Sequence, residues 1–229
     1  METEKDSEKW YVGHRKRVKE RFWEGKASKN ELIEILLTCV IPRIDVKPLV
    51  YGLLKKFGDI HGIISASWED LRGFRGMTEN AMTAIKAAYE ITLSEYNRRL
   101  SDSPILNDDK RLYDYCGLLL MSKKQEEFHV LLLDKNCRLL QDYVHASGLA
   151  EKVNVSPQKI VQRAIEAHAK FVILAHNHPD SNDSFSIQDV KLTTEIKNML
   201  DAVRVEVLDH ILICGLGAMY SAKAMFLLK

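Results

Sequence analysis

The first hundred residues show the apolar spacing of amphipathic helices. Hydrophobic side chains recur at intervals of three and four positions, with polar residues between them. Asn30 and Ser67 are expected as N-caps, and Gly58 suits the position that follows a helix C-terminus. The pattern predicts a helical region, with helices over 29–41, 45–57, 67–72 and, after a tight turn, up to residue 100.

Beyond residue 108 the pattern changes to a mixture of helices and short apolar strands. Strands over 126–134 and 138–148 are predicted to form a hairpin. The segment "KFVILA", residues 170–175, is apolar almost throughout, which is typical of a strand buried on both faces. Helices are expected over 109–121, 156–169 and 186–202, and closing strands over 203–215 and 218–222. Helices that alternate with an apolar sheet predict an α/β (α+β) layered domain.

A polar segment separates the two patterns. Residues 101–110 contain Pro104 and interrupt the helical spacing. We therefore expect two domains, a helical one over 1–100 and a mixed one over 104–229.

The composition is that of an ordinary globular protein, with 229 residues of which 46% are hydrophobic and 28% charged. The net charge of +1 predicts no polyanionic partner for the chain as a whole. Residues 9–30 are locally basic, with eight Lys or Arg against two Glu. This segment, which includes "HRKRVKERF", is either the solvated face of an amphipathic helix or a phosphate-binding arm.

The cysteines and the N-terminus bear on the cellular compartment. Cys39, Cys116, Cys137 and Cys214 are widely spaced and form no C-x-x-C pair. No apolar run approaches the roughly 20 residues that span a bilayer. The N-terminal "METEKDSEKW" lacks the hydrophobic segment of a signal peptide. We expect reduced thiols, a cytoplasmic location and no membrane partner.

Residues with metal-binding side chains are concentrated in "AHNHPDSNDSFSIQD", residues 175–189. In an extended segment His176 and His178 point to the same side and can reach one cation. Asp189, near the start of the next helix, is the natural third ligand of a Zn²⁺ site that keeps one position open for water. Alternatively, Ser186 and Asp189 only cap that helix, and the histidines are polar edge residues.

The spacing of these residues resembles a known signature. His176-x-His178, seven residues and then Ser186-x-x-Asp189 look like the motif of the JAB/MPN-plus (JAMM) metalloprotease superfamily. The flanking "VSPQKIVQRAI" and "VEVLDHILI", together with "GHRKRVKERFWEG" and "IPRIDVKPL" near the N-terminus, are similar to the RadC family within it. The resemblance implies a helical N-terminal domain followed by a cytidine-deaminase-like/JAB-MPN mixed sheet that is flanked by helices.

The resemblance also implies a zinc hydrolase site. His176, His178 and Asp189 would bind Zn²⁺, and Ser186 would help to hold the attacking water or the developing oxyanion. RadC proteins usually continue with Ser-Gly after the histidine motif. This chain has Asp180-Ser181 there, which changes the turn chemistry of the loop.

The family pattern places the general base two residues before a phenylalanine on an earlier strand. In this chain that residue is Glu126, before Phe128. The adjacent Glu127 points to the opposite face of the strand, so only one of the two can serve. We choose Glu126, which would take a proton from water and pass it to the leaving amine.

A second resemblance lies in the helical half. "LRGFRGMTENAMTAIKAAYEI" is similar to a helix-hairpin-helix, in which a Gly-hydrophobic-Gly turn brings backbone N–H groups close to a DNA phosphate. Here Gly76 is followed by Met77 and Thr78, so the second glycine is replaced. Arg75 and Lys86 could assist in DNA binding. Alternatively, the segment is a structural turn between two packed helices.

Two functions of different classes follow. The first is a RadC-like zinc metallohydrolase that cleaves an amide or isopeptide bond of a peptide or protein. The second is a DNA-binding accessory protein in repair or recombination, with a structural or catalytically silent zinc site. The two can hold together, because they use different parts of the chain.

Overall fold

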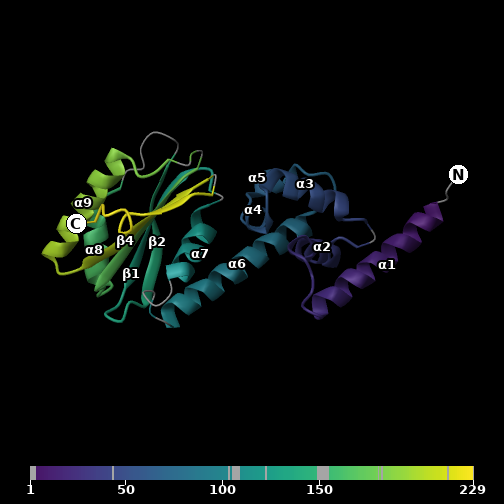
Figure 1. Ribbon diagram of the computed structural model, residues 1–229, viewed down its shortest axis with the longest axis horizontal. Helices are drawn as coiled ribbons and strands as arrows, with labels where there is room; N and C mark the ends of the chain where they lie inside the picture. The colour runs from purple at the N-terminus through teal and green to yellow at the C-terminus, as the bar shows by residue number, and fades with distance from the viewer. Residues whose placement is uncertain are drawn as a thin grey trace. The chain divides into compact units, whose positions relative to one another are not determined.

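The computed structural model describes residues 4–42, 44–102, 104, 109–121, 123–148, 155–179, 181, 183–215 and 217–228, with the side chains of 4–12 and 109 left out. The chain forms two compact units, Met1–Ile91 and Thr92–Lys229 (Figure 1). The division falls inside one long helix. The segment 101–110, where we expect the domain boundary, is only partly within the described residues.

The first unit is helical. Its helices are α1 (Glu4–Trp23), α2 (Lys29–Val40), α3 (Lys47–Phe57), α4 (Ile60–Ile64), α5 (Trp68–Arg72) and the first part of α6 (Glu79–Asp102). Apolar side chains of α2 to α6 share one core, which includes Leu37, Leu53 and Ile85. The helical spacing read from the sequence therefore marks the face that each helix buries.

The expected cap of α2 is wrong by two residues. Ser28, not Asn30, is the N-cap: its hydroxyl accepts the N–H of Glu31, and the Glu31 carboxylate accepts the N–H of Ser28. This reciprocal pair satisfies two backbone donors at once, whereas a cap at Asn30 has no acidic partner three residues later. Ser67 caps α5 as expected.

The second unit is built around a five-stranded mixed sheet with the order β2-β1-β3-β4-β5. The strands are β1 (Glu126–Leu133), β2 (Leu139–Gly148), β3 (Phe171–His178), β4 (Glu206–Cys214) and β5 (Met219–Ser221). Only β3 and β4 are parallel, and α9 (Ile187–Ala202) connects them as the crossover helix. The other neighbours are antiparallel.

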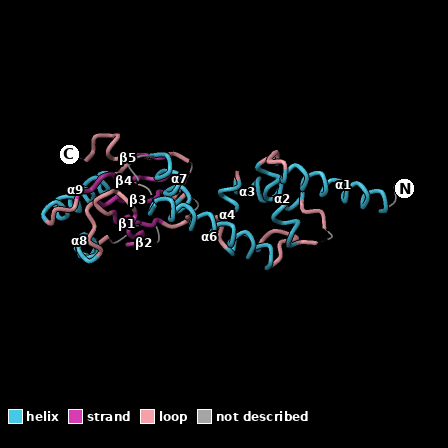
Figure 2. The backbone as a smooth tube through the Cα atoms, turned by 90° about the horizontal axis from the view of Figure 1, so that it is seen from below, coloured by secondary structure: helices cyan, strands magenta, loops and turns pink. Residues whose placement is uncertain are grey.

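Both faces of the sheet are covered. Helices α8 (Pro157–Glu166) and α9 pack on one face, and α7 (Asp109–Leu120) with the end of α6 packs on the other. Figures 1 and 2 show α8 and α9 on the opposite side of the strands from α7. Because side chains alternate along β1, Val130 faces the first layer and Leu131 the second. The predicted α/β class, with a helical N-terminal region, is confirmed.

Strand β3 is longer than its apolar run. The prediction ended at Ala175, but pairing with β4 continues to His178, opposite Cys214. His176 is paired on both sides, whereas Asn177 and His178 are paired with β4 alone. Among the described residues, no helix combines the length and apolar character needed to cross a lipid bilayer.

Candidate metal centre

Four side chains from three elements meet at one end of the sheet. Glu126 comes from β1, His176 and His178 from β3, and Asp189 from the first turn of α9. Each contributes one nitrogen or oxygen, and these four atoms all lie within 4.8 Å of one another. The common strand face explains the pairing of the histidines, since residues two apart on a strand point to the same side.

The distances among three of these residues suit one small cation. His176 Nε2 lies 3.2 Å from His178 Nε2 and 3.4 Å from Asp189 Oδ1, and His178 Nε2 lies 3.5 Å from Asp189 Oδ2. Ligands at about 2.0–2.1 Å from a tetrahedral Zn²⁺ ion are roughly 3.3–3.4 Å apart. Two imidazole nitrogens this close also need a hydrogen or a cation between them. The donor set of two nitrogens and carboxylate oxygens is one that zinc accepts.

Asp189 both caps α9 and faces the histidines. Its Oδ2 accepts the N–H of Ser186 at 2.7 Å, and its own N–H donates to Ser186 Oγ at 3.1 Å. This capping box fixes the first turn of α9, so the carboxylate is held before any ligand arrives. The capping role and the ligand role, which the sequence leaves as alternatives, are therefore compatible in one geometry.

The hydrogen bonds at the centre shift the pKa values of Asp189 and His178 toward their charged forms. Burial alone raises the pKa of Asp189, but hydrogen bonds from His176 and His178 outweigh burial and hold that pKa well below its ordinary value. The hydrogen bond to Asp189 in turn raises the pKa of His178. A carboxylate that stays ionised is the form that can bind a cation.

His176, the more buried of the two histidines, is shielded from water by neighbouring rings. His176 is 1% exposed and lies against the rings of Phe128 and Phe185, with centroids 6.1 and 5.8 Å away. His210, fully buried on β4, is 2.8 Å from His176 Nδ1 through its Nε2 atom. Burial, followed by the charge of His176, lowers the pKa of His210 well below its ordinary value. His210 is therefore a neutral neighbour of the proposed ligand His176.

The end of β3 is held by a close backbone approach. The N–H of Gly215 donates to the carbonyl oxygen of His178 at 2.9 Å. A Cβ atom at this position would lie 1.6 Å from the carbonyl oxygen of Pro179, so only glycine fits. The loop after β4 therefore fixes the backbone next to His178. A glycine at the end of a predicted strand was the available sequence signal, and it was not interpreted as part of the site.

Asn177 positions the strand that carries Glu126. Its side-chain oxygen accepts the N–H of Glu127 at 2.8 Å, and its amide nitrogen donates to the carbonyls of Gln125 and Lys123 at 3.1 and 3.4 Å. The ladder between β1 and β3 ends at Phe128. The amide therefore replaces backbone pairing just where Glu126 lies. Alternation along β3 could have revealed this role, since a residue between two inward-facing histidines must face the other way.

The opposite face of β1 carries a second polar cluster that sequence reasoning missed. His129, 4% exposed, has Nε2 at 3.1 Å from Glu127 and Nδ1 at 3.3 Å from Asp142. The hydroxyl of Tyr115 donates to the other oxygen of Asp142 at 2.6 Å. Burial lowers the pKa of His129, but its hydrogen bonds to Asp142 and Glu127 outweigh burial and raise it. The expectation that Glu127 points away from Glu126 agrees with these contacts.

Of the hairpin residues in the first unit, Arg75, Gly76 and Thr78 lie between α5 and α6, and Lys86 lies on α6. Gly76 has φ +87°, and a Cβ added there would meet nothing within 4 Å. The Thr78 hydroxyl accepts the N–H of Ala81 at 3.1 Å at the start of α6. Arg75 is exposed, whereas Lys86 pairs with Glu90 at 2.8 Å.

The loop after His178 is described only in part. Asp180, where the family usually has Ser, lies outside the described residues. Ser181 accepts the N–H of Asp183 at 3.2 Å, and Asp183 is exposed. The Asp183 backbone also forms a hydrogen bond with His178, but among the described residues of the loop none contributes a ligand atom to the group of four.

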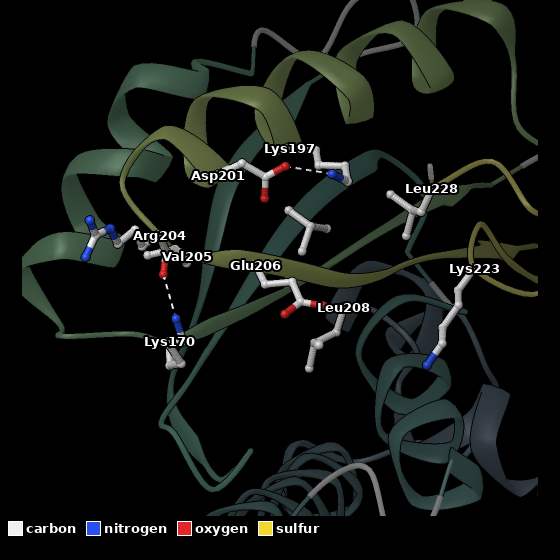
Figure 3. A pocket seen from close by; sticks show the side chains of 10 residues that line it. Lys170, Lys197, Asp201, Arg204, Val205, Glu206, Leu208, Lys223 and Leu228 are labelled. Atoms are coloured by element: carbon white, nitrogen blue, oxygen red, sulfur yellow. Dashed lines mark hydrogen bonds and ion pairs between the residues drawn. The ribbon is translucent and has the colours of Figure 1, made fainter.

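A hollow of about 540 Å³ opens at the other end of β3 and β4 (Figure 3). Lys170, which lines it, precedes β3, whereas the histidines end that strand. Lys170 Nζ donates to the carbonyl of Arg204, which follows α9, and Lys197 pairs with Asp201 at 2.6 Å. These two lysines have structural partners, and we assign the hollow no ligand.

Comparison with known proteins defines the family. A family model described as "RadC-like JAB domain" matches residues 106–226, more than half of the chain. The chain belongs to the RadC-like JAB domain family. It is also similar to the UPF0758 protein SPO0054 of Ruegeria pomeroyi, with 34% identity over 203 residues that cover 87% of this chain and 91% of the relative. The resemblance to RadC proteins is confirmed, and the RadC-like JAB domain contains all four residues of the cluster.

Proposed function

We propose that the RadC-like JAB domain is a zinc-dependent hydrolase of amide or isopeptide bonds in a peptide or protein substrate. The observation that carries the proposal is the set of three distances, 3.2, 3.4 and 3.5 Å, among His176, His178 and Asp189. Each is within a few tenths of an ångström of the roughly 3.3–3.4 Å that separates two ligands of a tetrahedral zinc ion, with the His176 distance measured to Asp189 Oδ1 and the His178 distance to Oδ2. The fourth corner is left for water.

The proposed ligands are His176 Nε2, His178 Nε2 and Asp189. When bound, a zinc ion lowers the pKa of a water molecule to about 7 and polarises a carbonyl. The protein supplies the two imidazoles, the ionised carboxylate and the aromatic rings that limit access of bulk water. Low polarity around these charges strengthens their interactions with a reacting group.

Glu126 is the proposed general base. It is half-buried at the edge of the cluster, and its carboxylate lies within 4.8 Å of the ligand atoms of the other three residues. From there it can accept a proton from the attacking water and return it to the leaving amine. Ser186 is the proposed donor to the tetrahedral oxyanion, because the capping box places its hydroxyl next to Asp189.

The test is metal-dependent cleavage. Zinc-loaded protein is incubated with unbiased peptide and isopeptide-linked libraries, and products are identified by mass spectrometry. We expect cleavage that chelation abolishes and added Zn²⁺ restores, that Asp189→Ala eliminates, and that Asp183→Ala preserves. Asp183 is a matched control because it is an exposed carboxylate in the same connection. Cleavage that resists chelation, or no cleavage of any library member, would contradict the proposal.

The hairpin supports a second candidate function, DNA binding by the helical unit. The supporting observation is Gly76, whose left-handed φ and open surroundings leave the backbone accessible to a phosphate. Fluorescence anisotropy with a DNA duplex should show affinity that falls steeply with salt. Arg75→Ala should reduce the salt slope by about one, whereas Lys191→Ala on α9 should not change it. Equal slopes for both variants would contradict a role of this hairpin.

A further inference from the structure

A buried chain of hydrogen bonds joins two proposed zinc ligands through residues that are not ligands. It runs from His176 Nδ1 to His210 Nε2 at 2.8 Å, and from His210 Nδ1 to the Thr193 hydroxyl at 2.6 Å. The Thr193 hydroxyl then donates to the backbone carbonyl of Asp189 at 2.6 Å. The three side chains are 1%, 0% and 4% exposed, so the chain is shielded from solvent.

The direction of every hydrogen bond in this series is determined at its Asp189 end. The carbonyl of Asp189 can only accept, so the Thr193 hydroxyl must donate its single hydrogen there. The hydroxyl oxygen must then accept from His210 Nδ1–H. A neutral imidazole with hydrogen on Nδ1 has an acceptor at Nε2, so His176 Nδ1–H must donate to it. The remaining nitrogen of His176, Nε2, is then the atom that faces His178 and Asp189 and can give its lone pair to a bound ion in place of its hydrogen bond to Asp189.

We infer that Thr193 and His210 are positioning residues that select the metal-binding tautomer of His176. The inference rests on the proposed zinc site, because it concerns the nitrogen that binds the ion. Metal-bound histidines depend on a partner for their other ring nitrogen, which sets both tautomer and ring orientation. Here the partner of His176 is the imidazole of His210. The tautomer of His210 is set by Thr193, which lies on α9, the helix that carries Asp189.

The residues around His210 leave its ring nitrogens few other hydrogen-bond partners. Phe128 lies 5.5 Å and Phe185 5.1 Å from the His210 ring, centroid to centroid, which limits access of water. Without the Thr193 hydroxyl, His210 Nδ1–H has no acceptor among its described partners. The ring regains a bond by moving its hydrogen to Nε2, where it would face His176 Nδ1. His176 would then carry its hydrogen on Nε2, the atom needed for the metal.

The test compares two neighbouring threonines on α9. Thr193→Val removes the buried hydroxyl at nearly constant volume. Thr194→Val is the matched control, because the Thr194 hydroxyl makes the same type of bond, to the carbonyl of Val190 at 2.8 Å, but is exposed. Zn²⁺ affinity is measured by competition with a chromophoric chelator. We expect Thr193→Val to weaken binding about 10- to 100-fold, and Thr194→Val less than about twofold.

Two further measurements separate positioning from a general structural defect. Thr193→Ser keeps a hydroxyl and should restore affinity to near the wild-type value. Long-range ¹H–¹⁵N NMR on zinc-loaded wild type should show His210 with its hydrogen on Nδ1. A His210 hydrogen on Nε2, or equal affinity in Thr193→Val and Thr194→Val, would overturn the inference while leaving the zinc site intact. A wild-type protein that binds no Zn²⁺ would overturn the proposed function, and this inference with it.

Discussion

The two faces of strand β1 use the same residue types in opposite arrangements. On one face Glu126 joins His176, His178 and Asp189, and ligand atoms from all four lie within 4.8 Å of one another. On the other face His129 lies between Glu127 and Asp142, with one carboxylate at each ring nitrogen.

We propose that convergence of lone pairs, rather than residue type, distinguishes the proposed zinc site from the second cluster. The first cluster directs several acceptor atoms at one point, which is stable only with a cation or hydrogen there. The second cluster satisfies both ring nitrogens by hydrogen bonds on opposite sides of the imidazole. Their lone pairs cannot share one ion, so we expect the second cluster to stabilise the sheet and not to bind metal.

The largest expected effect is on zinc affinity. His176→Ala should weaken Zn²⁺ binding roughly 1,000-fold or more, because three protein ligands share a binding free energy of about 10–16 kcal/mol. His129→Gln, on the other face, should change it by less than about twofold. Isothermal titration of both variants makes the measurement. Weak zinc binding in His129→Gln would show that the two faces are not separate.

The next effect separates the adjacent glutamates. Glu126→Gln should lower turnover roughly 100- to 1,000-fold while zinc stays bound, because loss of a general base removes about that factor. Glu127→Gln should leave turnover within a few-fold, because its carboxylate contacts Lys123 and His129 on the opposite face. Steady-state kinetics on a substrate identified by the library screen compares the two. The reverse ranking would assign the base to Glu127.

These predictions start from features that the sequence could provide. The spacing of His176, His178 and Asp189 needed only the alternation of a strand and the position of a helix start. Glu126 needed the resemblance as well, since alternation alone places one glutamate on each face without saying which. Local patterns sufficed because each of these residues is near the end of an element whose type was predicted correctly.

The sequence could not place His210 on the face of the proposed zinc site. The pairing of β3 with β4 shifts by one residue between Val172 and Ile173, so that Asp209, rather than Leu208, lies opposite Ile173. A shift of one residue reverses which side chains face each layer. Accordingly Val207 packs toward α8 and α9, whereas Ile211 packs toward α7. Such a bulge depends on packing between the layers of the domain. The pattern of apolar and polar residues along one strand therefore does not predict it.

An intermediate effect is expected at Asn177. Its side chain lies on the same face of the sheet as the second cluster, but its hydrogen bonds position the strand end that carries Glu126 of the first cluster. Asn177→Ala removes the three hydrogen bonds that hold residues 123–127, where the chain is no longer paired with β3. We expect turnover to fall about 10- to 100-fold, because small displacements of a catalytic group cost that much. Zinc affinity should change less than about threefold, since β4 and α9 still hold the ligands. Faster hydrogen exchange at the Glu127 amide would accompany the loss.

A matched variant tests this link. Asn136→Ala removes an amide side chain from the exposed β1–β2 turn at the other end of the strand. It should leave both turnover and the exchange rate of Glu127 unchanged. If Asn177→Ala also leaves both unchanged, Asn177 does not position Glu126.

The smallest effect is the pH dependence of stability at His129. Hydrogen bonds to Asp142 and Glu127 raise the pKa of His129 against burial, and the bond from His129 lowers the pKa of Glu127 against burial. The raised His129 pKa gives stability that is complete below the unfolded value of about 6.5 and is lost as pH rises through the folded value. The lowered Glu127 pKa gives stability that is complete above about 4.3 and is lost as pH falls.

The two contributions therefore act together between about pH 4.3 and 6.5. In metal-free protein, His129→Gln should reduce the free energy of unfolding by about 1–3 kcal/mol at pH 5.5 and by less at pH 9. His168→Gln is the control, because His168 is exposed and forms no ion pair among the described residues; it should change the free energy of unfolding little at either pH. Urea unfolding at the two pH values measures both. If the loss in His129→Gln were the same at pH 5.5 and pH 9, the imidazole of His129 would act only through packing, and the second cluster would be held together without its charge.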